Sequence, residues 1–268
     1  MALQNTVLIT GAGTRVGAHL AKGLAEDGWH VAVHYNRSKL AADLLIQEIK
    51  KAGGEAVGIQ GNLVVPQDVD TLIDRAASAL GAPLTALINN ASTYRPDLSE
   101  DFTRATYDYH MDVNLRAAMT LTQAFAAQSP KTANASVINM IDQRVLKPNP
   151  LYFTYSMSKA ALYWATKTLA QSLAPTIRVN GVGPGPTYQN TQQTLDAFEA
   201  ECALTLLERG SPPEEILRAA RYLLSATSVT GQMIAVDGGQ HLNWDTADLT
   251  LELINNPPED YIVLNPDE

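Results

Sequence analysis

Two patterns of apolar and polar residues alternate along the chain. Short runs rich in valine, isoleucine and alanine are typical of strands buried on both faces, whereas longer stretches with apolar residues every three or four positions predict amphipathic helices. Because these patterns alternate, we expect a parallel sheet with helices on both faces. The predicted strands are residues 6–10, 30–35, 56–60, 86–89, 136–140, 178–182 and 233–236, and the predicted helices include 18–27, 41–52, 68–80, 104–127 and 153–173.

The alternation continues to residue 244 and predicts a single α/β domain with a Rossmann-like, doubly wound parallel sheet. No break in composition divides the 268 residues into two domains. Ligands of such sheets bind beyond the carboxyl ends of the strands. Residues 188–210 read as a helical lid over this cleft, and residues 245–268 read as an acidic tail. Gly11, Asn89, Asp142 and Gly183 stand at or just after strand ends, so we expect them to converge on one cleft.

The composition limits the classes of molecule that the chain is expected to bind. The net charge of −9 and the pI near 5.0 disfavour nucleic acid and anionic membranes as binding partners. The single cysteine, Cys202, excludes an internal disulfide and fits a reducing compartment. No signal-like start, no apolar run long enough to span a bilayer and no metal-ligand spacing is visible. We therefore expect a cytoplasmic protein that holds no metal and acts on a small molecule.

A glycine-rich turn, Thr10-Gly11-Ala12-Gly13-Thr14-Arg15-Val16-Gly17, follows the first predicted strand and precedes the helix at 18–27. In this setting a pyrophosphate can sit on the helix N-terminus, and glycine lets the backbone approach the phosphates closely. The alternative is an ordinary strand-to-helix turn. The position of this turn after the first strand of an α/β chain favours dinucleotide binding.

The cofactor can be chosen from the end of the second predicted strand. Folds that prefer NAD place an acidic residue there to bind the ribose hydroxyls. This chain has Arg37 and Ser38 instead. A guanidinium and a hydroxyl suit the 2′-phosphate of NADPH, which a carboxylate would repel. A solvated loop arginine is the alternative, and we predict NADPH.

Tyr155 and Lys159 stand four residues apart in the predicted helix at 153–173, so their side chains share one face. A phenol beside an ammonium is a proton donor, because the positive charge favours the phenolate and lowers the pKa of the tyrosine. A Tyr–Lys pair alone also fits a solvated helix face. In a chain that opens with a dinucleotide turn, the catalytic interpretation is the stronger one.

Together these motifs resemble the short-chain dehydrogenase/reductase family over residues 1 to about 244. The resemblance implies that Tyr155 donates a proton, that Lys159 binds the nicotinamide ribose, and that Asn114 holds a water linking Lys159 to solvent. It also implies that Thr10 and Asn89 brace the cofactor turn and its ribose. The matching pieces are the turn at 10–17, Asn89-Asn90-Ala91, Asn114, Tyr155 with Lys159, Pro184-Gly185 and Val236-Asp237-Gly238-Gly239.

The same resemblance implies the remaining cofactor contacts and the assembly. Residues 184 to 187 would orient the carboxamide end of the nicotinamide, and the helix at 153–173 with the long helix before it would form a homotetramer. The implied NADPH-binding residues are Gly11, Thr14, Arg15, Val16, Tyr35, Asn36, Arg37, Ser38, Asn62, Leu63, Asn90, Ala91, Ser92, Tyr155, Lys159, Pro184, Gly185 and Thr187.

Two departures from the family pattern indicate a subgroup. Arg15 replaces a usual glycine and Asp142 replaces the usual catalytic serine. Both resemble the pteridine reductases and the related dihydromonapterin or dihydrofolate reductases. A carboxyl can donate or accept a proton and can hydrogen-bond an amino-substituted ring. The implied catalytic set is Asn114, Asp142, Tyr155 and Lys159, and the implied set that binds a pterin-like substrate is Arg15, Ser92, Tyr94, Asp142 and Tyr155.

Several alternatives stay open at this point. Tyr94 would lie against the substrate ring, or it is a loop tyrosine half-packed on the surface. Asp142 would act on the substrate, or it is a structural carboxylate paired with a cation such as Arg144. The whole chain would reduce pterins, or it is a carbonyl or 3-ketoacyl-type reductase, or a non-catalytic NADP(H) sensor. The intact set of Tyr155, Lys159 and Asn114 argues against a sensor, which needs no proton relay.

Overall fold

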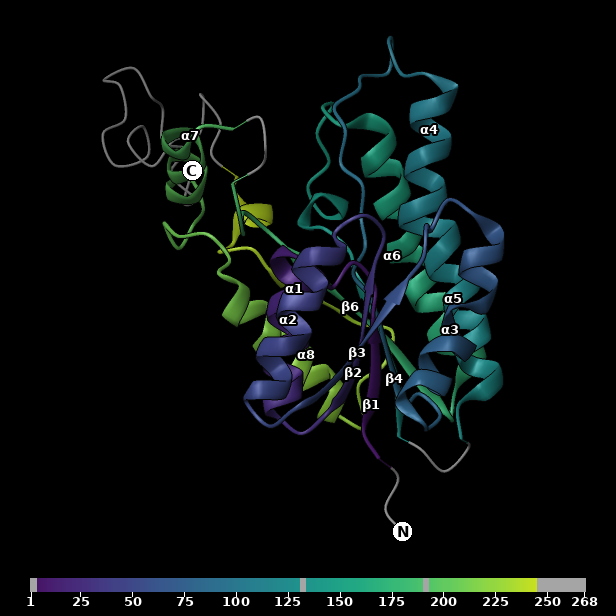
Figure 1. Ribbon diagram of the computed structural model, residues 1–268. Helices are drawn as coiled ribbons and strands as arrows, with labels where there is room; N and C mark the ends of the chain where they lie inside the picture. The colour runs from purple at the N-terminus through teal and green to yellow at the C-terminus, as the bar shows by residue number, and fades with distance from the viewer. Residues whose placement is uncertain (1–3, 131–133, 190–192, 245–268) are drawn as a thin grey trace, which may run out of the picture.

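The computed structural model describes residues 4–130, 134–189 and 193–244. Seven strands form one sheet in the order β3-β2-β1-β4-β5-β6-β7, and every neighbouring pair is parallel (Figure 1). The predicted α/β class and doubly wound parallel sheet are therefore confirmed. The strands are β1 (Thr6–Ile9), β2 (His30–Tyr35), β3 (Glu55–Gln60), β4 (Ala86–Asn89), β5 (Ala135–Met140), β6 (Ile177–Pro184) and β7 (Met233–Val236).

Helices cover both faces of the sheet, which is why most strand residues are buried on both sides. One layer holds α1 (Arg15–Glu26), α2 (Lys39–Lys51) and α8 (Pro213–Ser225), and it packs on β1 and β2 through aliphatic side chains such as Leu20 and Leu24. The other layer, on the right of Figure 1, holds α3 (Pro66–Leu80), α4 (Arg104–Met111), α5 (Ala117–Gln128) and α6 (Phe153–Leu173).

The chain changes direction in the sheet between β1 and β4. β1 pairs with β2 on one side and with β4 on the other, so the carboxyl ends of β1 and β4 bound the crevice where open α/β sheets bind ligands. Thr10 holds this crevice in shape, because its Oγ1 accepts the backbone N–H groups of Asn90 and Ala91, both at 2.9 Å. The turn-bracing role predicted for Thr10 agrees with this geometry.

Asn89 does not have the place predicted for it. Its side chain is buried within the sheet layer and donates to Asn139 Oδ1 at 2.9 Å and to Thr122 Oγ1 at 3.3 Å. It therefore ties β4 to β5 and α5, whereas the next residue, Asn90, lines the crevice. The reason is the alternation of side chains along a strand, which sends successive residues to opposite faces.

The helix predicted at 104–127 is interrupted. A π-helical turn, η1 (Asp112–Arg116), separates α4 from α5 and contains Asn114. The buried Asn114 side chain donates to Thr93 O and to Ser158 Oγ, both at 3.0 Å, so contacts outside the helix hold the wider turn in place. Such π-bulges often occur at functional sites.

Within the described part of the predicted helical lid at 188–210, which leaves out residues 190–192, the structure has one α-helix, α7 (Leu195–Ala203). Thr194 begins this helix by accepting the Ala197 N–H at its side chain. Thr205 ends the segment in a turn, because its hydroxyl accepts the Arg209 N–H at 3.1 Å and donates to Arg209 O at 2.8 Å. The predicted tail at 245–268 lies outside the described residues.

Two further absences hold for the described ranges. No helix within them combines the length and the apolar character needed to cross a membrane. Within the same ranges, no three or more histidine, cysteine, aspartate or glutamate side chains are grouped as a metal site.

Candidate active site

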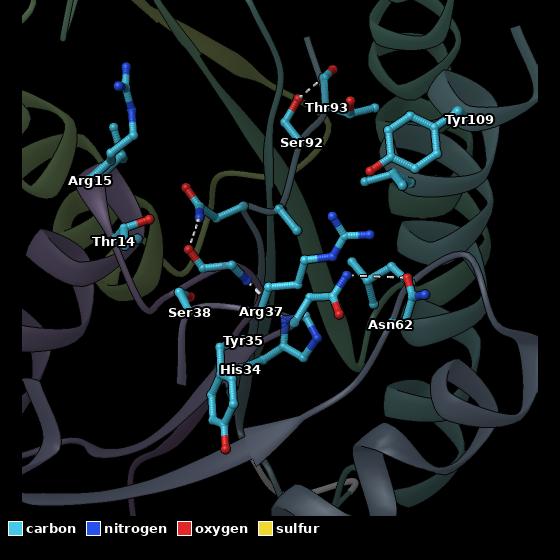
Figure 2. A pocket seen from close by; sticks show the side chains of 18 residues that line it. Thr14, Arg15, His34, Tyr35, Arg37, Ser38, Asn62, Ser92, Thr93 and Tyr109 are labelled. Atoms are coloured by element: carbon cyan, nitrogen blue, oxygen red, sulfur yellow. Dashed lines mark hydrogen bonds between the residues drawn. The ribbon is translucent and has the colours of Figure 1, made fainter. Parts of the chain in front are cut away.

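A hollow of about 540 Å³ lies at the carboxyl ends of β1, β2 and β4 (Figure 2). It brings together every cofactor residue predicted from the first part of the chain. Gly17 of the predicted glycine-rich turn lines it as well, and so do His34, Thr93, Tyr109 and Val113, which were not predicted. The predicted residues in it are Gly11, Thr14, Arg15, Val16, Tyr35, Asn36, Arg37, Ser38, Asn62, Leu63, Asn90, Ala91 and Ser92.

The glycine turn forms a cradle that side chains would fill. Gly11 has a φ of +62°, and a Cβ on it would lie 3.0 Å from the Cα of Ala91. A Cβ on Gly17 would lie 2.4 Å from the carbonyl oxygen of Gly11. Thr14 begins α1 without a side-chain cap, so the first backbone N–H groups of the helix stay available to an anion. The cradle fits a pyrophosphate.

Arg15 keeps the backbone that glycine would adopt freely, with a φ of +52°. Its guanidinium donates to Gln189 O at 3.1 Å and to Tyr188 O at 3.4 Å, and its Cζ lies 5.1 Å from the centroid of the Tyr188 ring. Figure 2 shows this side chain extending away from Arg37. Arg15 therefore connects the glycine turn with the segment that follows β6.

His34 supports the glycine turn from below, and the sequence reasoning gave it no role of its own. The backbone N–H of Gly11 donates to His34 Nδ1 at 3.0 Å, so the proton is on Nε2, which donates to Gly61 O at 3.1 Å. Burial lowers the pKa of His34 to about 4, and Arg75 adds to this effect. A polar residue among the apolar ones of a buried strand is a sequence signal for such a role.

Arg37 is an exposed cation next to the cradle. Figure 2 shows it above His34 and Tyr35, near Asn62. It makes no hydrogen bond or ion pair with any residue that the structure describes, whereas the neighbouring Asn36 donates to Asn62 Oδ1 at 3.4 Å. Ser38 follows directly and begins α2. A free guanidinium with a hydroxyl beside it can bind a 2′-phosphate.

A second hollow, of about 440 Å³, continues the first and shares Arg15, Val16, Asn90 and Ser92 with it. All the remaining predicted residues except Asn114 line it: Tyr94, Asp142, Tyr155, Lys159, Pro184, Gly185 and Thr187. Pro186 from the predicted nicotinamide segment and Tyr188, Gln193, Phe198 and Glu201 from the predicted lid also line it, together with Met140, Ile141, Gln143, Arg144, Tyr152 and Gln240.

Tyr155 and Asp142 form a direct hydrogen bond in this second hollow. The buried phenol donates to Asp142 Oδ2 at 2.7 Å. Burial raises the pKa of Tyr155 well above its usual value, the Asp142 carboxylate raises it further, and Arg144 opposes the effect. Tyr155 is therefore a neutral phenol whose proton forms the hydrogen bond to the Asp142 carboxylate.

The expected lowering of the Tyr155 pKa by Lys159 is not what this structure shows. Lys159 Nζ lies 5.8 Å from the centroid of the Tyr155 ring and donates to Met140 O at 2.7 Å. Burial lowers the pKa of Lys159 to about 8, although Asp142 favours its charge. Burial and the hydrogen bond to Asp142 stabilise the protonated phenol of Tyr155, whereas the Lys159 ammonium is directed at the Met140 carbonyl.

Asn114 lies behind the cleft and lines neither hollow. Besides the two bonds that it donates, its Oδ1 accepts Thr93 N–H at 2.8 Å and Ser92 Oγ at 3.3 Å. It therefore fixes the backbone that follows β4, and it forms no hydrogen bond with Lys159, whose ammonium donates to Met140 O. The predicted water between Asn114 and Lys159 stays a prediction.

Three tyrosines cluster at the mouth of the second hollow. Tyr94 stacks on Tyr152, with centroids 4.0 Å apart and planes 14° apart, and it meets Tyr155 in an edge arrangement at 4.8 Å. One face of the Tyr94 ring is therefore covered by Tyr152, so a substrate ring can pack only against the rest of the Tyr94 ring. Tyr152 takes a left-handed φ of +59° directly before α6.

Known proteins resemble this chain over most of its length. The model of the short chain dehydrogenase family matches residues 5–200. The 3-oxoacyl-(acyl-carrier-protein) reductase of Synechocystis sp. is 33% identical over 236 residues, covering 87% of this chain and 95% of the relative. The corresponding FabG reductase of Staphylococcus aureus is 31% identical over 90% of this chain and 100% of its own length.

Solved structures agree with this likeness. FolM alternative dihydrofolate reductase 1 from Brucella suis, in complex with NADP, matches with a TM-score of 0.90 and 39% identity, covering 93% of this chain and 100% of that one. The angucycline C-6 ketoreductase LanV with bound NADP matches with a TM-score of 0.83 and 30% identity, covering 89% of this chain and 96% of that one.

Proposed function

Since this chain belongs to the short-chain dehydrogenase family, we propose that it is an NADPH-dependent reductase of dihydropterins or dihydrofolate-type substrates. The coarser part of this function, an NADP-dependent short-chain oxidoreductase, follows from the family and from the NADP in its structural neighbours. The finer part, reduction of a pterin C=N bond, rests on the substrate half of the cleft.

The chain's own residues divide the work between the two hollows. The turn at Gly11 and Gly17 and the start of α1 would hold the pyrophosphate, and Arg37 with Ser38 would hold the 2′-phosphate. Lys159, Pro184 and Thr187 stand where the nicotinamide end would lie. When bound, NADPH supplies the hydride. The residues of the second hollow then have to hold the substrate and deliver one proton.

Tyr155 is placed to deliver that proton. When the carbon of the C=N bond gains a hydride, the electron pair of the double bond moves to the nitrogen, which takes the hydroxyl proton of Tyr155. Solvent returns a proton to the phenolate that is left. Asp142, which accepts the phenol hydrogen bond, keeps the phenol protonated before the reaction and orients its oxygen.

The observation that carries the pterin assignment is the Asp142 carboxylate, bonded to Tyr155 at 2.7 Å inside the substrate hollow. A carboxyl group can exchange a proton with a ring nitrogen, whereas the serine usual at this position can only hydrogen-bond a carbonyl oxygen. The structural likeness to a protein named as an alternative dihydrofolate reductase supports the same assignment.

The test compares Asp142→Ser with the wild-type enzyme. NADPH oxidation is followed with dihydrobiopterin, dihydromonapterin, dihydrofolate, acetoacetyl thioester and simple ketones. We expect the variant to lose pterin turnover by more than about 10-fold, because the carboxylate that positions the proton donor Tyr155 is lost, and to keep its NADPH affinity. Asp142→Asn serves as a matched control, because it keeps the shape of the side chain without its negative charge.

A second candidate, reduction of a 3-oxoacyl thioester, is favoured by the FabG-type relatives. On that hypothesis Asp142 is a structural carboxylate, and its ion pair with Arg144 at 3.5 Å supplies the cation that such a role needs. Asp142→Ser would then lower the melting temperature and leave the ranking of substrates unchanged. Pterin turnover at the wild-type level in a stable Asp142→Ser variant would remove Asp142 as the reason for preferring pterins over carbonyls, and a wild-type enzyme that does not turn over pterins would refute the pterin assignment.

A further inference from the structure

Arg144 is a cation of the substrate hollow that the proposed proton transfer does not use. Asp142 Oδ1 accepts the backbone N–H of Arg144 at 2.8 Å and so begins the short 3-10 turn η2 (Gln143–Val145). This turn folds the Arg144 side chain back over the carboxylate that caps it, with Nη1 at 3.5 Å from Asp142 Oδ2. The spacing Asp-x-Arg therefore produces an anion and a cation side by side in the hollow.

The guanidinium is held in place without a hydrogen bond. Its Nε is buried and has no partner, and the side chain as a whole, 19% exposed, donates no hydrogen bond to any residue that the structure describes. The Cζ of Arg144 lies 5.6 Å from the centroid of Tyr94 and 5.7 Å from that of Tyr152. Since the two centroids are 4.0 Å apart, the guanidinium lies alongside the stacked pair and not over one end of it.

Arg144 keeps its charge in this position. Burial opposes the charge, but Asp142, Tyr94, Tyr155 and Glu201 outweigh burial and raise the pKa of Arg144. Buried N–H donors without partners destabilise a protein unless a ligand satisfies them. The two tyrosine rings and the ion pair with Asp142 thus hold the Arg144 guanidinium in place. Its N–H groups are available for hydrogen bonds, and it lies beside the carboxylate that contacts Tyr155.

We propose that Arg144 is a specificity-determining residue that donates to the ring carbonyl oxygen next to the C=N nitrogen of the substrate. This inference rests on the proposed reduction of pterins and adds the orientation of the ring. In a dihydropterin, the pyrimidine carbonyl oxygen and the C=N nitrogen that is protonated lie side by side at the ring junction. The side chains of the hollow have the same order. Tyr155, held by Asp142, supplies a proton for the nitrogen, and the neighbouring Arg144 supplies a hydrogen-bond donor for the oxygen.

The discriminating ligand is a ring in which an amino group replaces this oxygen. Its N–H groups would face the N–H groups of Arg144, so two donors would oppose each other. A 3-oxoacyl thioester has no ring edge of this kind. The site therefore selects for the carbonyl form of a fused pyrimidine ring, and this preference should depend on one side chain.

The experiment measures the affinities of pterin and of diaminopteridine, its analogue with an amino group in place of the carbonyl oxygen, for the enzyme saturated with NADP⁺. Titrations are made at a pH at which both ligands are neutral. We expect wild-type enzyme to prefer pterin by about 10- to 100-fold, the effect of one charge-assisted hydrogen bond against an opposed donor. Arg144→Met should weaken pterin binding and bring the ratio of the two affinities close to one.

Two controls separate recognition from folding. Arg104→Met removes a cation whose side chain is 94% exposed on α4 and should leave the ratio unchanged. Arg144→Lys keeps the charge and should keep part of the preference. The melting temperature and the NADP⁺ affinity of each variant show that the fold and the first hollow are intact.

The outcomes are distinct for the two proposals. If wild-type enzyme reduces dihydropterins but Arg144→Met keeps the wild-type ratio, the role of Arg144 is refuted and the proposed function stands. If wild-type enzyme neither binds nor reduces pterins, the proposed function fails, and the role of Arg144 fails with it.

Discussion

His34 makes the stability of the cradle sensitive to acid. The neutral ring accepts the Gly11 N–H and is buried, and burial lowers its pKa from 6.5 to about 4. In the unfolded chain the ring has its ordinary pKa, so below pH 6.5 the unfolded state binds a proton that the folded state does not. The stability contributed by the neutral ring is therefore complete above pH 6.5 and is lost as the pH falls to about 4.

The size of this loss follows from the two pKa values. A tenfold difference in a protonation equilibrium is worth about 1.4 kcal/mol, so the difference between 6.5 and about 4 corresponds to about 3 kcal/mol. That is a large part of the net stability of a typical domain, about 5 to 15 kcal/mol. We therefore expect one buried histidine to dominate the acid limb of the stability curve between these pH values.

The perturbation is His34→Asn, which offers an oxygen to the Gly11 N–H and does not titrate. Urea unfolding at one protein concentration, at a series of pH values from above 6.5 down to about 4, gives the free energy of unfolding of both proteins. The variant should be less stable at neutral pH, because it loses the hydrogen bond to Gly61. Between pH 6.5 and about 4, its free energy of unfolding should fall by about 3 kcal/mol less than that of the wild-type protein.

His19→Gln is the matched control, since it removes a histidine whose side chain is 29% exposed on α1. Its unfolding free energy should follow the wild-type dependence on pH. Parallel curves for wild-type protein and His34→Asn would show that His34 is not the group that titrates, and the reasoning from its buried hydrogen bonds would be refuted.

Three further predictions concern the cofactor, the proton and the assembly. Arg37→Asp should invert the preference from NADPH to NADH, because it replaces the free cation by a carboxylate; equal fluorescence-titrated affinities of wild-type enzyme for the two cofactors would contradict the assignment. Tyr155→Phe should abolish turnover and leave NADPH affinity nearly intact, whereas Lys159→Ala should reduce both; substantial turnover by the Phe variant would remove Tyr155 from the mechanism. Light scattering should give a homotetramer, since α6 exposes 68% of Trp164 on its outer face, and a monomer would refute this.

The architecture was predictable because it depends on local patterns. The strands of the sheet core are buried on both faces, as the continuous apolar runs at Val7–Ile9 and Ala86–Ile88 required, and their bounds agree with the predicted ones to within two residues. Glycines and strand ends placed the cofactor half of the cleft for the same reason. These features can be recognised from residues that are adjacent in the sequence.

The rest of the site depends on contacts between distant segments. The π-turn at Asn114 follows from bonds to Thr93 and Ser158, which no helical periodicity contains. The raised pKa of Tyr155 comes from burial and from its hydrogen bond to Asp142, and spacing along α6 predicts neither. Likewise, the sequence left open whether Tyr94 lies against a substrate ring or is half-packed on the surface, and the structure shows that Tyr152 covers one side of it.

Arg15 shows how sequence and structure complete one another. The sequence marks it as an arginine in place of a usual glycine, and the structure shows that its backbone still has the left-handed conformation, with a φ of +52°. That conformation costs a non-glycine residue about 1 to 2 kcal/mol. Glycine would remove this strain but also the contacts to Tyr188 and Gln189 across the cleft. Because both hollows meet at Arg15, a strained backbone here is best explained by what the guanidinium does when cofactor and substrate are present.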